Sequence, residues 1–120
     1  MTASRPLARL EDRALLPMVP ELRFDLERPD TRGAVRIGAL IGDPVRAGII
    51  AILRDGPHCV CEMAAALGER QNNISNHLAR LRDAGLVRAS RHAADARWVY
   101  YERDEAACAA AAAAIAEVLG

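Results

Sequence analysis

Apolar side chains recur at helical spacing through the middle of the chain and predict a series of short helices. Segment 33–42 carries four apolar residues at near-helical spacing. Asp43 followed by Pro44 is typical of a helix start, because the carboxylate accepts hydrogen bonds from free amides and proline fits the first turn. A second helix is therefore expected over 44–55.

Apolar residues at the same helical spacing predict two further helices. Segment 59–67 is largely apolar and stops at Gly68, and segment 71–84 places apolar positions at i, i+4 and i+7 before Gly85. Glycine after the last apolar position is a common helix end, because it adopts the left-handed conformation without strain. Only residues 68–70 separate the two helices, so the connection is tight.

After this pair of helices the period changes. Segments 86–92 and 97–103 are rich in valine, tyrosine, tryptophan and alternating arginine, which predicts two β-strands with a loose turn between them. Segment 105–119 is alanine-rich and is expected to form a last helix, with Cys108 on its apolar stripe. Residues 1–32 contain four prolines and no sustained period.

This order of elements predicts a winged helix-turn-helix, a mainly α fold with a two-stranded β-hairpin as the wing. Residues 33–120 form the folded domain, and residues 1–32 form an N-terminal extension to which the sequence assigns no role. A chain of 120 residues has room for one such domain and one hydrophobic core.

The charge of the chain is neutral in total but uneven along its length. All sixteen basic residues are arginine, and segment 70–103 holds seven of them against three acidic residues. A basic face of this kind favours nucleic acid as the partner. In a helix-turn-helix the second helix enters the major groove, where short polar side chains read base edges and arginines hold phosphates. The residues predicted to read bases are Gln71, Asn72, Ser75 and Asn76, and those predicted to hold phosphates are Arg80, Arg82, Arg88, Arg91 and Arg97.

Two of the three cysteines, Cys59 and Cys61, stand one residue apart at a predicted helix start. An odd count with so close a pair does not suit a secreted disulfide framework, so reduced thiols are expected. Helix N-termini lower the pKa of thiols, and thiolates bind soft ions. Residues i and i+2 of a helix point about 200° apart. Both sulfurs therefore converge only if Cys59 lies outside the helix or its first turn deforms, and we hypothesise that a bound ion distorts this helix start and shifts segment 71–84.

Two simpler interpretations of these residues stay open. Cys59 and Cys61 are also small apolar side chains that can be buried and inert. His58 adjoins them and can serve either as a nitrogen ligand or as a polar contact.

Segment 43–91 resembles the arsenic-repressor (ArsR/SmtB) family of bacterial winged-helix metal sensors, and the resemblance extends over roughly 34–119. The matching features are Asp43-Pro44 with Arg46, the CVCE run at 59–62, Ile74-Ser75-x-His77-Leu78 and Ala84-Gly85-Leu86-Val87. The resemblance implies a cytoplasmic homodimer that contacts its partner through the first and last helices of the domain. It also implies that the dimer binds palindromic double-stranded operator DNA and releases it when a metal or metalloid binds.

The recognition helix departs from the family pattern at its start. Glu69-Arg70 stand where the family usually has a serine or threonine cap. Gln71, Ser75 and His77 match the family pattern, and His77 is a candidate DNA contact that can equally be a packing residue.

The CVC run occurs in the family's arsenic sensors, so trivalent arsenic, As(III), or antimony, Sb(III), is the expected inducer, with Cys59, Cys61 and Cys108 as candidate ligands. In several arsenic sensors a third cysteine follows, at the position of Ala64 here. In related sensors C-terminal cysteines sometimes complete a site, even across the dimer, so Cys108 is either a ligand or simply a buried packing residue of the helix interface. Cd(II), Pb(II) and Zn(II) are alternative inducers, although residues 1–32 contain none of the cysteines that such sensors add. A dithiol redox-sensing repressor that pairs Cys59 or Cys61 with Cys108 is a further alternative.

The sequence contains no phosphate-binding glycine loop, metalloprotease motif or nucleophile elbow, so we expect that it is not an enzyme. A thiol-based arsenate reductase and a winged-helix adaptor or metal buffer without an operator are the competing classes. An assay of arsenate turnover tests the reductase, and the affinity for DNA measured at several salt concentrations tests the adaptor or buffer. No apolar run reaches the ~18 residues of a membrane span, and the charged start does not suit a signal peptide, which predicts a cytosolic protein.

Overall fold

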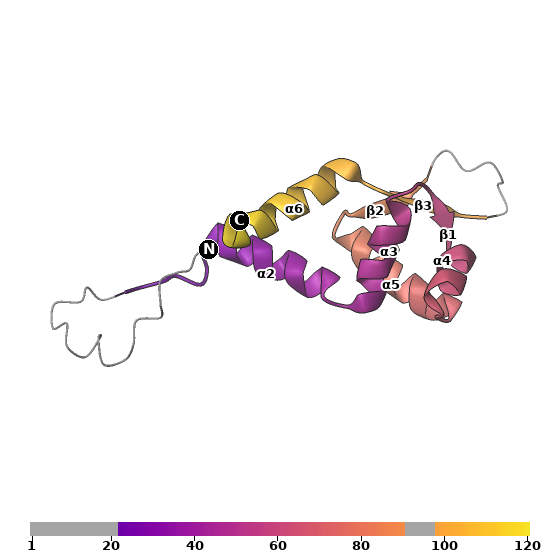
Figure 1. Cartoon of the computed structure of the whole chain (residues 1–120), viewed down its shortest axis with the longest axis horizontal. Coiled ribbons are helices and arrows are strands. Elements are labelled where there is room, and N and C mark those ends of the chain that lie inside the picture. The colour runs from indigo at the N-terminus through magenta and orange to yellow at the C-terminus, as the bar shows by residue number, and fades with distance from the viewer. Residues whose placement is uncertain (1–21, 91–97) are drawn as a thin grey trace.

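The computed structural model describes residues 22–90 and 98–120, which form five helices and three short strands (Figure 1). In chain order they are α2 (Pro29–Ile41), α3 (Pro44–Leu53), β1 (His58–Cys59), α4 (Val60–Leu67), α5 (Gln71–Asp83), β2 (Val87–Ala89), β3 (Tyr100–Arg103) and α6 (Glu105–Leu119). The predicted fold class, mainly α with a β-hairpin wing, is confirmed. None of the helices in these ranges has the length and apolar character that a membrane crossing requires.

Helices α3, α4 and α5 enclose the main hydrophobic core. Ile74, Leu78 and Leu81, which form the predicted apolar stripe of α5, are at most 2% exposed. The other buried members of this core are Ile49, Leu53, Met63, Ala64, Leu86 and Val87. Burial of these side chains is the main stabilising contribution. Helices α4 and α5 thus share one close-packed core.

Local sequence explains where α3 and α4 begin and end. The Asp43 carboxylate accepts the backbone N–H groups of Val45 at 2.8 Å and Arg46 at 3.1 Å, which caps α3 as predicted. Gly68 ends α4 in the left-handed conformation with φ of 66°. The Asp43 cap and Gly68 thus fix the start of α3 and the end of α4.

Helices α2 and α6 pack side by side, and the start of α2 lies next to the end of α6 (Figure 1). Helix α2 begins at Pro29 rather than at Gly33, because proline and the acidic Asp30 suit a first turn. Only Ile37 of α2 is buried, and no residue of α6 is buried. The pair therefore leaves much of its apolar surface uncovered in the single chain.

The sheet has three antiparallel strands in the order β1-β3-β2, one more than the predicted hairpin. Strand β1 places Cys59 opposite Tyr100 of β3. The prediction that Cys59 opens a helix is wrong, because α4 begins at Val60 and Cys59 has an extended backbone with φ of −91° and ψ of 168°. A strand of two residues has no period that the sequence can reveal.

Candidate dithiol site and nucleic-acid interface

Cys59 and Cys61 meet at the junction between β1 and α4. Cys59 is the last residue of β1 and the N-cap of α4, and Cys61 lies in the first turn of α4. Their Sγ atoms are 2.7 Å apart, and both cysteines are free thiols. Of the two ways in which the sulfurs were expected to converge, the structure has the first, because Cys59 lies outside the helix. The helix itself does not have to deform.

Cys59 and Glu62 cap the start of α4 reciprocally. The Cys59 Sγ atom accepts the backbone N–H of Glu62, and Glu62 Oε1 accepts the backbone N–H of Cys59 at 2.9 Å. This is a capping box in which cysteine replaces the usual serine or threonine. Sequence reasoning missed Glu62, although the C-x-x-E spacing is the signal that would have found it. Cys59, a candidate ligand for the ion, is thus also the N-cap of α4.

The surroundings of Cys59 favour its protonated form. Burial raises the pKa of Cys59 above its ordinary value, and the neighbouring Cys61 thiol and Glu62 carboxylate raise it further, against the opposing effect of the Glu62 backbone N–H. The prediction that the helix start lowers this thiol's pKa is therefore wrong for Cys59, because desolvation of the thiolate outweighs the helix N-terminus. The hydrogen bond from the Cys59 backbone N–H lowers the pKa of Glu62, which keeps it a carboxylate.

The part of the chain that the structure describes brings no group of three candidate ligands together at the two thiols. Within residues 22–90 and 98–120, no three His, Cys, Asp or Glu side chains form a group that could hold a metal ion. His58 Nδ1 lies 2.9 Å from the carbonyl oxygen of Gly56, so this nitrogen is the donor of that bond. His58 is thus oriented by the loop before β1.

Cys108 occupies a separate place on α6. Its Sγ atom donates to the carbonyl oxygen of Leu86 at 3.7 Å, and the side chain packs against the hydrophobic core. Burial raises the pKa of the Cys108 thiol, and the nearby Arg103 guanidinium opposes this effect without prevailing. The half-buried position agrees with the simpler interpretation of Cys108 as a packing residue.

Helix α5 presents four of the predicted base-reading side chains to solvent. Gln71, Asn72, Ser75 and Asn76 are exposed, and the buried stripe of α5 faces the core. Arg80, one turn after Asn76, is also exposed and makes no ion pair with the residues that the structure describes. These side chains are free to meet base edges and phosphates.

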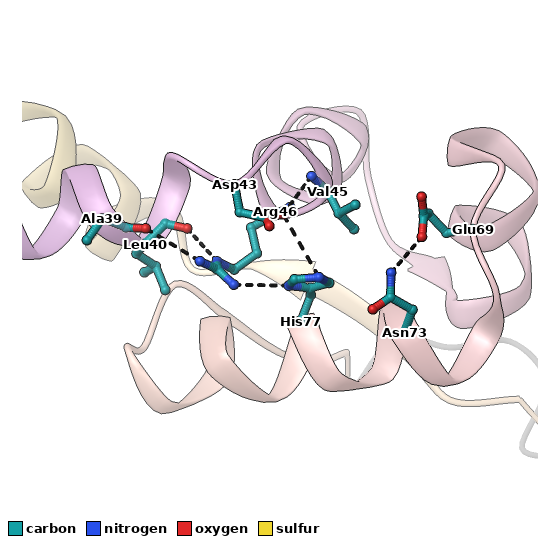
Figure 2. Close-up of polar contacts among 8 residues, drawn as sticks. All are labelled: Ala39, Leu40, Asp43, Val45, Arg46, Glu69, Asn73 and His77. Atoms are coloured by element: carbon teal, nitrogen blue, oxygen red, sulfur yellow. Dashed lines mark hydrogen bonds and ion pairs between the residues drawn. The ribbon is translucent and has the colours of Figure 1, made fainter.

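The start of α5 lacks a side-chain cap, as the departure from the family pattern indicated. Arg70 is the N-cap residue and its side chain makes no capping hydrogen bond. Instead, Asn73 Nδ2 donates to Glu69 Oε1 at 2.6 Å (Figure 2). This bond ties the first turn of α5 to the connection that precedes it.

His77 lies in the contact between α5 and α3 rather than with the exposed polar residues. Its Nδ1 is 3.0 Å from Arg46 Nη1, and its Nε2 is 3.9 Å from Asp43 Oδ1 (Figure 2). Because a guanidinium only donates, His77 Nδ1 is the acceptor. The geometry favours a packing role for His77, one of the two roles that the sequence left open.

Two of the predicted phosphate contacts, Arg88 and Arg82, are engaged by other side chains of the fold. Arg88 forms ion pairs with Glu102 at 2.9 Å and Asp104 at 3.1 Å. The Arg82 guanidinium lies over the ring of Tyr101, 5.6 Å from its centroid. Two further predicted phosphate contacts, Arg91 and Arg97, lie outside the described residues.

Helices α4 and α5, with the β2–β3 wing, define a winged helix-turn-helix domain that carries a dithiol at the junction between β1 and α4. The sequence profile described as "Bacterial regulatory protein, arsR family" matches residues 43–89. The chain is also 36% identical over 69 residues to an uncharacterised HTH-type transcriptional regulator of Methanocaldococcus jannaschii, which covers 57% of this chain and 74% of that protein. The chain belongs to the ArsR family.

Other relatives agree with this assignment. The arsenical resistance operon repressor of Escherichia coli K12 is 35% identical over 68 residues, and the match covers 56% of each protein, so the chain spans about half the length of that relative. A crystal structure of a possible transcriptional regulator for arsenical resistance is 30% identical, with a TM-score of 0.57, over 64% of this chain and 77% of the other. The homodimeric winged helix-turn-helix DNA-binding domain of a possible ArsR-family regulator from Mycobacterium bovis is 25% identical, with a TM-score of 0.57, over 76% and 82%. These proteins carry the names of regulators, not of enzymes.

Proposed function

We propose that the protein is a transcriptional repressor that binds palindromic operator DNA as a homodimer and leaves it when trivalent arsenic or antimony binds Cys59 and Cys61. The observation that carries the proposal is the 2.7 Å approach of the two sulfur atoms at the start of the helix before α5. Soft ions prefer thiolate ligands. The name of the Escherichia coli relative, an arsenical resistance operon repressor, supports arsenic as the inducer.

The exposed face of α5 supports operator binding. Asn and Gln side chains, such as Asn72 and Gln71, can pair bidentately with adenine in the major groove, and Ser75 can meet several base edges. Arg80 extends this face with a positive charge suited to phosphate. A dimer presents two such helices, and a two-fold axis between them requires a palindromic operator.

The uncovered surface of α2 and α6 supports homodimer formation. At the shared end of the two helices, exposed or half-buried apolar side chains line one shallow hollow, formed by Ala34, Val35, Ile115, Val118 and Leu119. A two-fold contact places the same patch on both subunits, so an apolar patch can cover itself. The homodimeric relative from Mycobacterium bovis supports this arrangement.

The coupling between inducer and DNA starts at the cap of α4. Two sulfur atoms bonded to one ion at about 2.3 Å each, with an angle of roughly 100° between the bonds as in the pyramid that trivalent arsenic prefers, would stand about 3.5 Å apart. Ion entry therefore widens the 2.7 Å approach of Cys59 and Cys61. Because Cys59 also caps α4, the widening loosens this helix start, and the fully buried Met63 passes the movement to α5 through the core. Such coupling typically changes the free energy of DNA binding by about 1–3 kcal/mol.

A dithiol redox switch is the second candidate function, and the same distance favours it. The two free thiols are direct neighbours, as an intramolecular disulfide requires. Oxidation by peroxide joins Cys59 to Cys61 while the thiols lose two electrons and two protons and the peroxide becomes two molecules of water. The pair named here differs from the predicted pairing with Cys108.

Operator release tests the proposal directly. A labelled palindromic operator is titrated with protein, and the complex is then titrated with arsenite, antimonite, Cd(II), Pb(II), Zn(II) and peroxide. The parent and the Cys59→Ser, Cys61→Ser and Cys108→Ser variants are compared. We expect arsenite or antimonite to release DNA from the parent and from Cys108→Ser only. If arsenite still releases the operator from the Cys59→Ser/Cys61→Ser double variant, the proposed site is wrong.

The salt dependence of binding separates a repressor from an adaptor without an operator. A dimer that makes about 6 to 10 phosphate contacts loses roughly 10³-fold to 10⁵-fold in affinity between 50 and 200 mM salt. Weak binding without sequence preference and without this steep slope would support the adaptor.

A further inference from the structure

We infer that an open hollow between α2 and α5 binds a phosphate group of the operator backbone, and that Arg36 of α2 contacts this phosphate directly. The inference rests on the proposed function, because it requires that α5 reads the operator. It extends the DNA-binding face of α5 and the wing onto α2. Three observations carry it: the charge of the hollow, the exposure of Arg36, and the position of the hollow beside the exposed stripe of α5.

The hollow lies between the C-terminal half of α2 and the end of α5, and its volume is about 510 Å³. Arg36, Arg46 and Arg80 line it, one each from α2, α3 and α5. Asp83 is the one acidic side chain in this lining, among the residues that the structure describes, and the rest of the lining is apolar. Three guanidinium groups against one carboxylate give the hollow a positive potential, which attracts an anion.

The Arg46 guanidinium is held in place at the hollow. It donates to the carbonyl oxygens of Leu40 and Ala39 and to Nδ1 of His77 (Figure 2). A guanidinium has five N–H groups, so these three bonds leave two that can still donate. Arg46 therefore supplies a fixed positive charge, and binding of a phosphate does not have to order this side chain.

Arg36 and Arg80 are available for a ligand. Both are exposed, and neither forms an ion pair with another residue of ranges 22–90 and 98–120. Arg32, one turn before Arg36 on α2, differs, because its Nε lies 3.7 Å from Glu27 Oε1. The planar fork of an arginine without such a partner can donate two parallel hydrogen bonds to one phosphate.

The exposed stripe of α5 leads into the hollow. Asn72, Asn76 and Arg80 follow one another at intervals of four residues, so they lie within about 80° of each other around the helix. Asn72 and Asn76 are predicted base readers, whereas Arg80 lines the hollow. A helix in the major groove lies between the two sugar–phosphate backbones of the duplex. DNA whose bases meet the two asparagines therefore brings a backbone phosphate to the end of α5 and the hollow beside it.

A contact from α2 gives the operator a second point of attachment. Phosphate contacts fix the register and the orientation of a protein on the duplex. Helix α2 also belongs to the surface proposed to form the dimer. A phosphate held by Arg36 therefore fixes the operator against the body of the dimer as well as against α5.

The salt dependence of operator binding tests the inference. A dimer contains two copies of Arg36, so Arg36→Gln removes two phosphate contacts, and the slope of log affinity against log salt should become less steep by about 1.8. Affinity at low salt should fall roughly tenfold or more, for the palindromic operator and for a non-specific duplex alike, because a phosphate contact carries no sequence information. Arg36→Lys keeps the charge and should retain most of the slope.

Arg32→Gln is the matched control for this substitution. It removes the same charge from the neighbouring turn of α2, but Arg32 does not line the hollow and is paired with Glu27. Its salt slope should stay close to that of the parent. All titrations use a protein concentration at which sedimentation velocity finds each variant dimeric, so that a change in dimer formation does not enter the comparison.

Neutral phosphates identify the contact directly. Operators that each carry one methylphosphonate in place of a phosphate are bound to the parent and to Arg36→Gln. We expect one position in each half-site at which neutralisation weakens binding by the parent but has no further effect on Arg36→Gln, because the arginine that meets this phosphate is already gone. Asp83→Asn removes the carboxylate from the hollow and should strengthen operator binding roughly twofold or more.

The outcomes separate the inference from the proposed function. The inference is overturned by a salt slope of Arg36→Gln equal to that of the parent or of Arg32→Gln. It is also overturned if every neutral phosphate affects the parent and Arg36→Gln equally, or if Asp83→Asn binds no more tightly than the parent. These results would leave the repressor standing. A parent protein that does not distinguish the operator from the non-specific duplex would overturn the proposed function itself.

Discussion

Arg46 Nη1 lies 3.0 Å from His77 Nδ1, and this bond joins the start of α3 to the middle of α5 (Figure 2). The same guanidinium donates to the carbonyl oxygens of Leu40 and Ala39 near the end of α2. One side chain therefore connects the helix proposed to form the dimer with the helix proposed to read DNA. Arginine suits this position because its planar fork donates in several directions at once.

Replacement of Arg46 by alanine should lower both stability and operator affinity. The change leaves the carbonyl groups of α2 and the His77 acceptor without their donor, which costs about 1–3 kcal/mol. Urea denaturation and operator titration measure the two effects. Arg54→Ala, an exposed arginine at the end of α3, is the matched control and should change stability by less than about 0.5 kcal/mol. Equal effects of the two substitutions would show that the bonds of Arg46 contribute nothing specific.

Met63→Ala should be among the most destabilising substitutions in the domain. Met63 is fully buried in the core that α4 shares with α5, and truncation of such a side chain leaves a cavity that costs about 2–5 kcal/mol. Met63→Leu keeps the volume and should cost less than about 1.5 kcal/mol. Urea denaturation at constant protein concentration checks both values. A loss below 1 kcal/mol for Met63→Ala would contradict the close packing between α4 and α5.

Val118→Asp should weaken the homodimer without unfolding the subunit. Val118 is exposed in the single chain and lines the apolar hollow at the shared end of α2 and α6. A charge placed in an apolar two-fold contact stands close to its own copy, so it is desolvated and repelled. Sedimentation velocity should find a larger share of monomer than in the parent, while circular dichroism stays unchanged. Glu117→Gln is the neighbouring control, and an unaltered dimer in Val118→Asp would place the interface elsewhere.

Stability should fall at alkaline pH because of Cys59. Burial raises the pKa of this thiol in the folded protein above its ordinary value of 9.0. Above that value the unfolded chain loses the proton while the folded chain retains it, so the free energy of unfolding falls as pH rises toward the folded pKa. Denaturation from pH 7 to pH 10.5 in a Cys61→Ser/Cys108→Ser background should record this decline. The same series with Cys59→Ser added should lack that part of the decline, and two identical curves would contradict the pKa shift.

Local patterns in the sequence predict most of the helices and the face that each one buries. Ile74, Leu78 and Leu81 repeat at helical spacing and are buried in α5, whereas Gln71 and Asn72 fall on the exposed face. The Asp43 cap and the glycine after α4 act within a few residues of their own position, so the chain needs no distant partner to reveal them.

Contacts between distant segments explain what sequence reasoning missed. Strand β1 exists only because it pairs with β3 about forty residues later, and two residues alone carry no strand signal. That pairing extends the backbone of Cys59, moves it out of the helix and turns its sulfur toward Cys61. The raised pKa of Cys59 has the same origin, because burial by the fold outweighs the local effect of a helix start.

The sequence by itself determined the order of the helices, the stripe that each one buries, the polar face of α5 and the presence of two thiols at one helix start. These properties depend on period, caps and residue chemistry over short distances. Only the tertiary structure decided that the two sulfurs converge without deforming α4, that Cys108 stands apart from them, and that His77 accepts from Arg46, 31 residues away in the chain. Such relationships depend on burial and on pairing between distant segments, which no local pattern encodes.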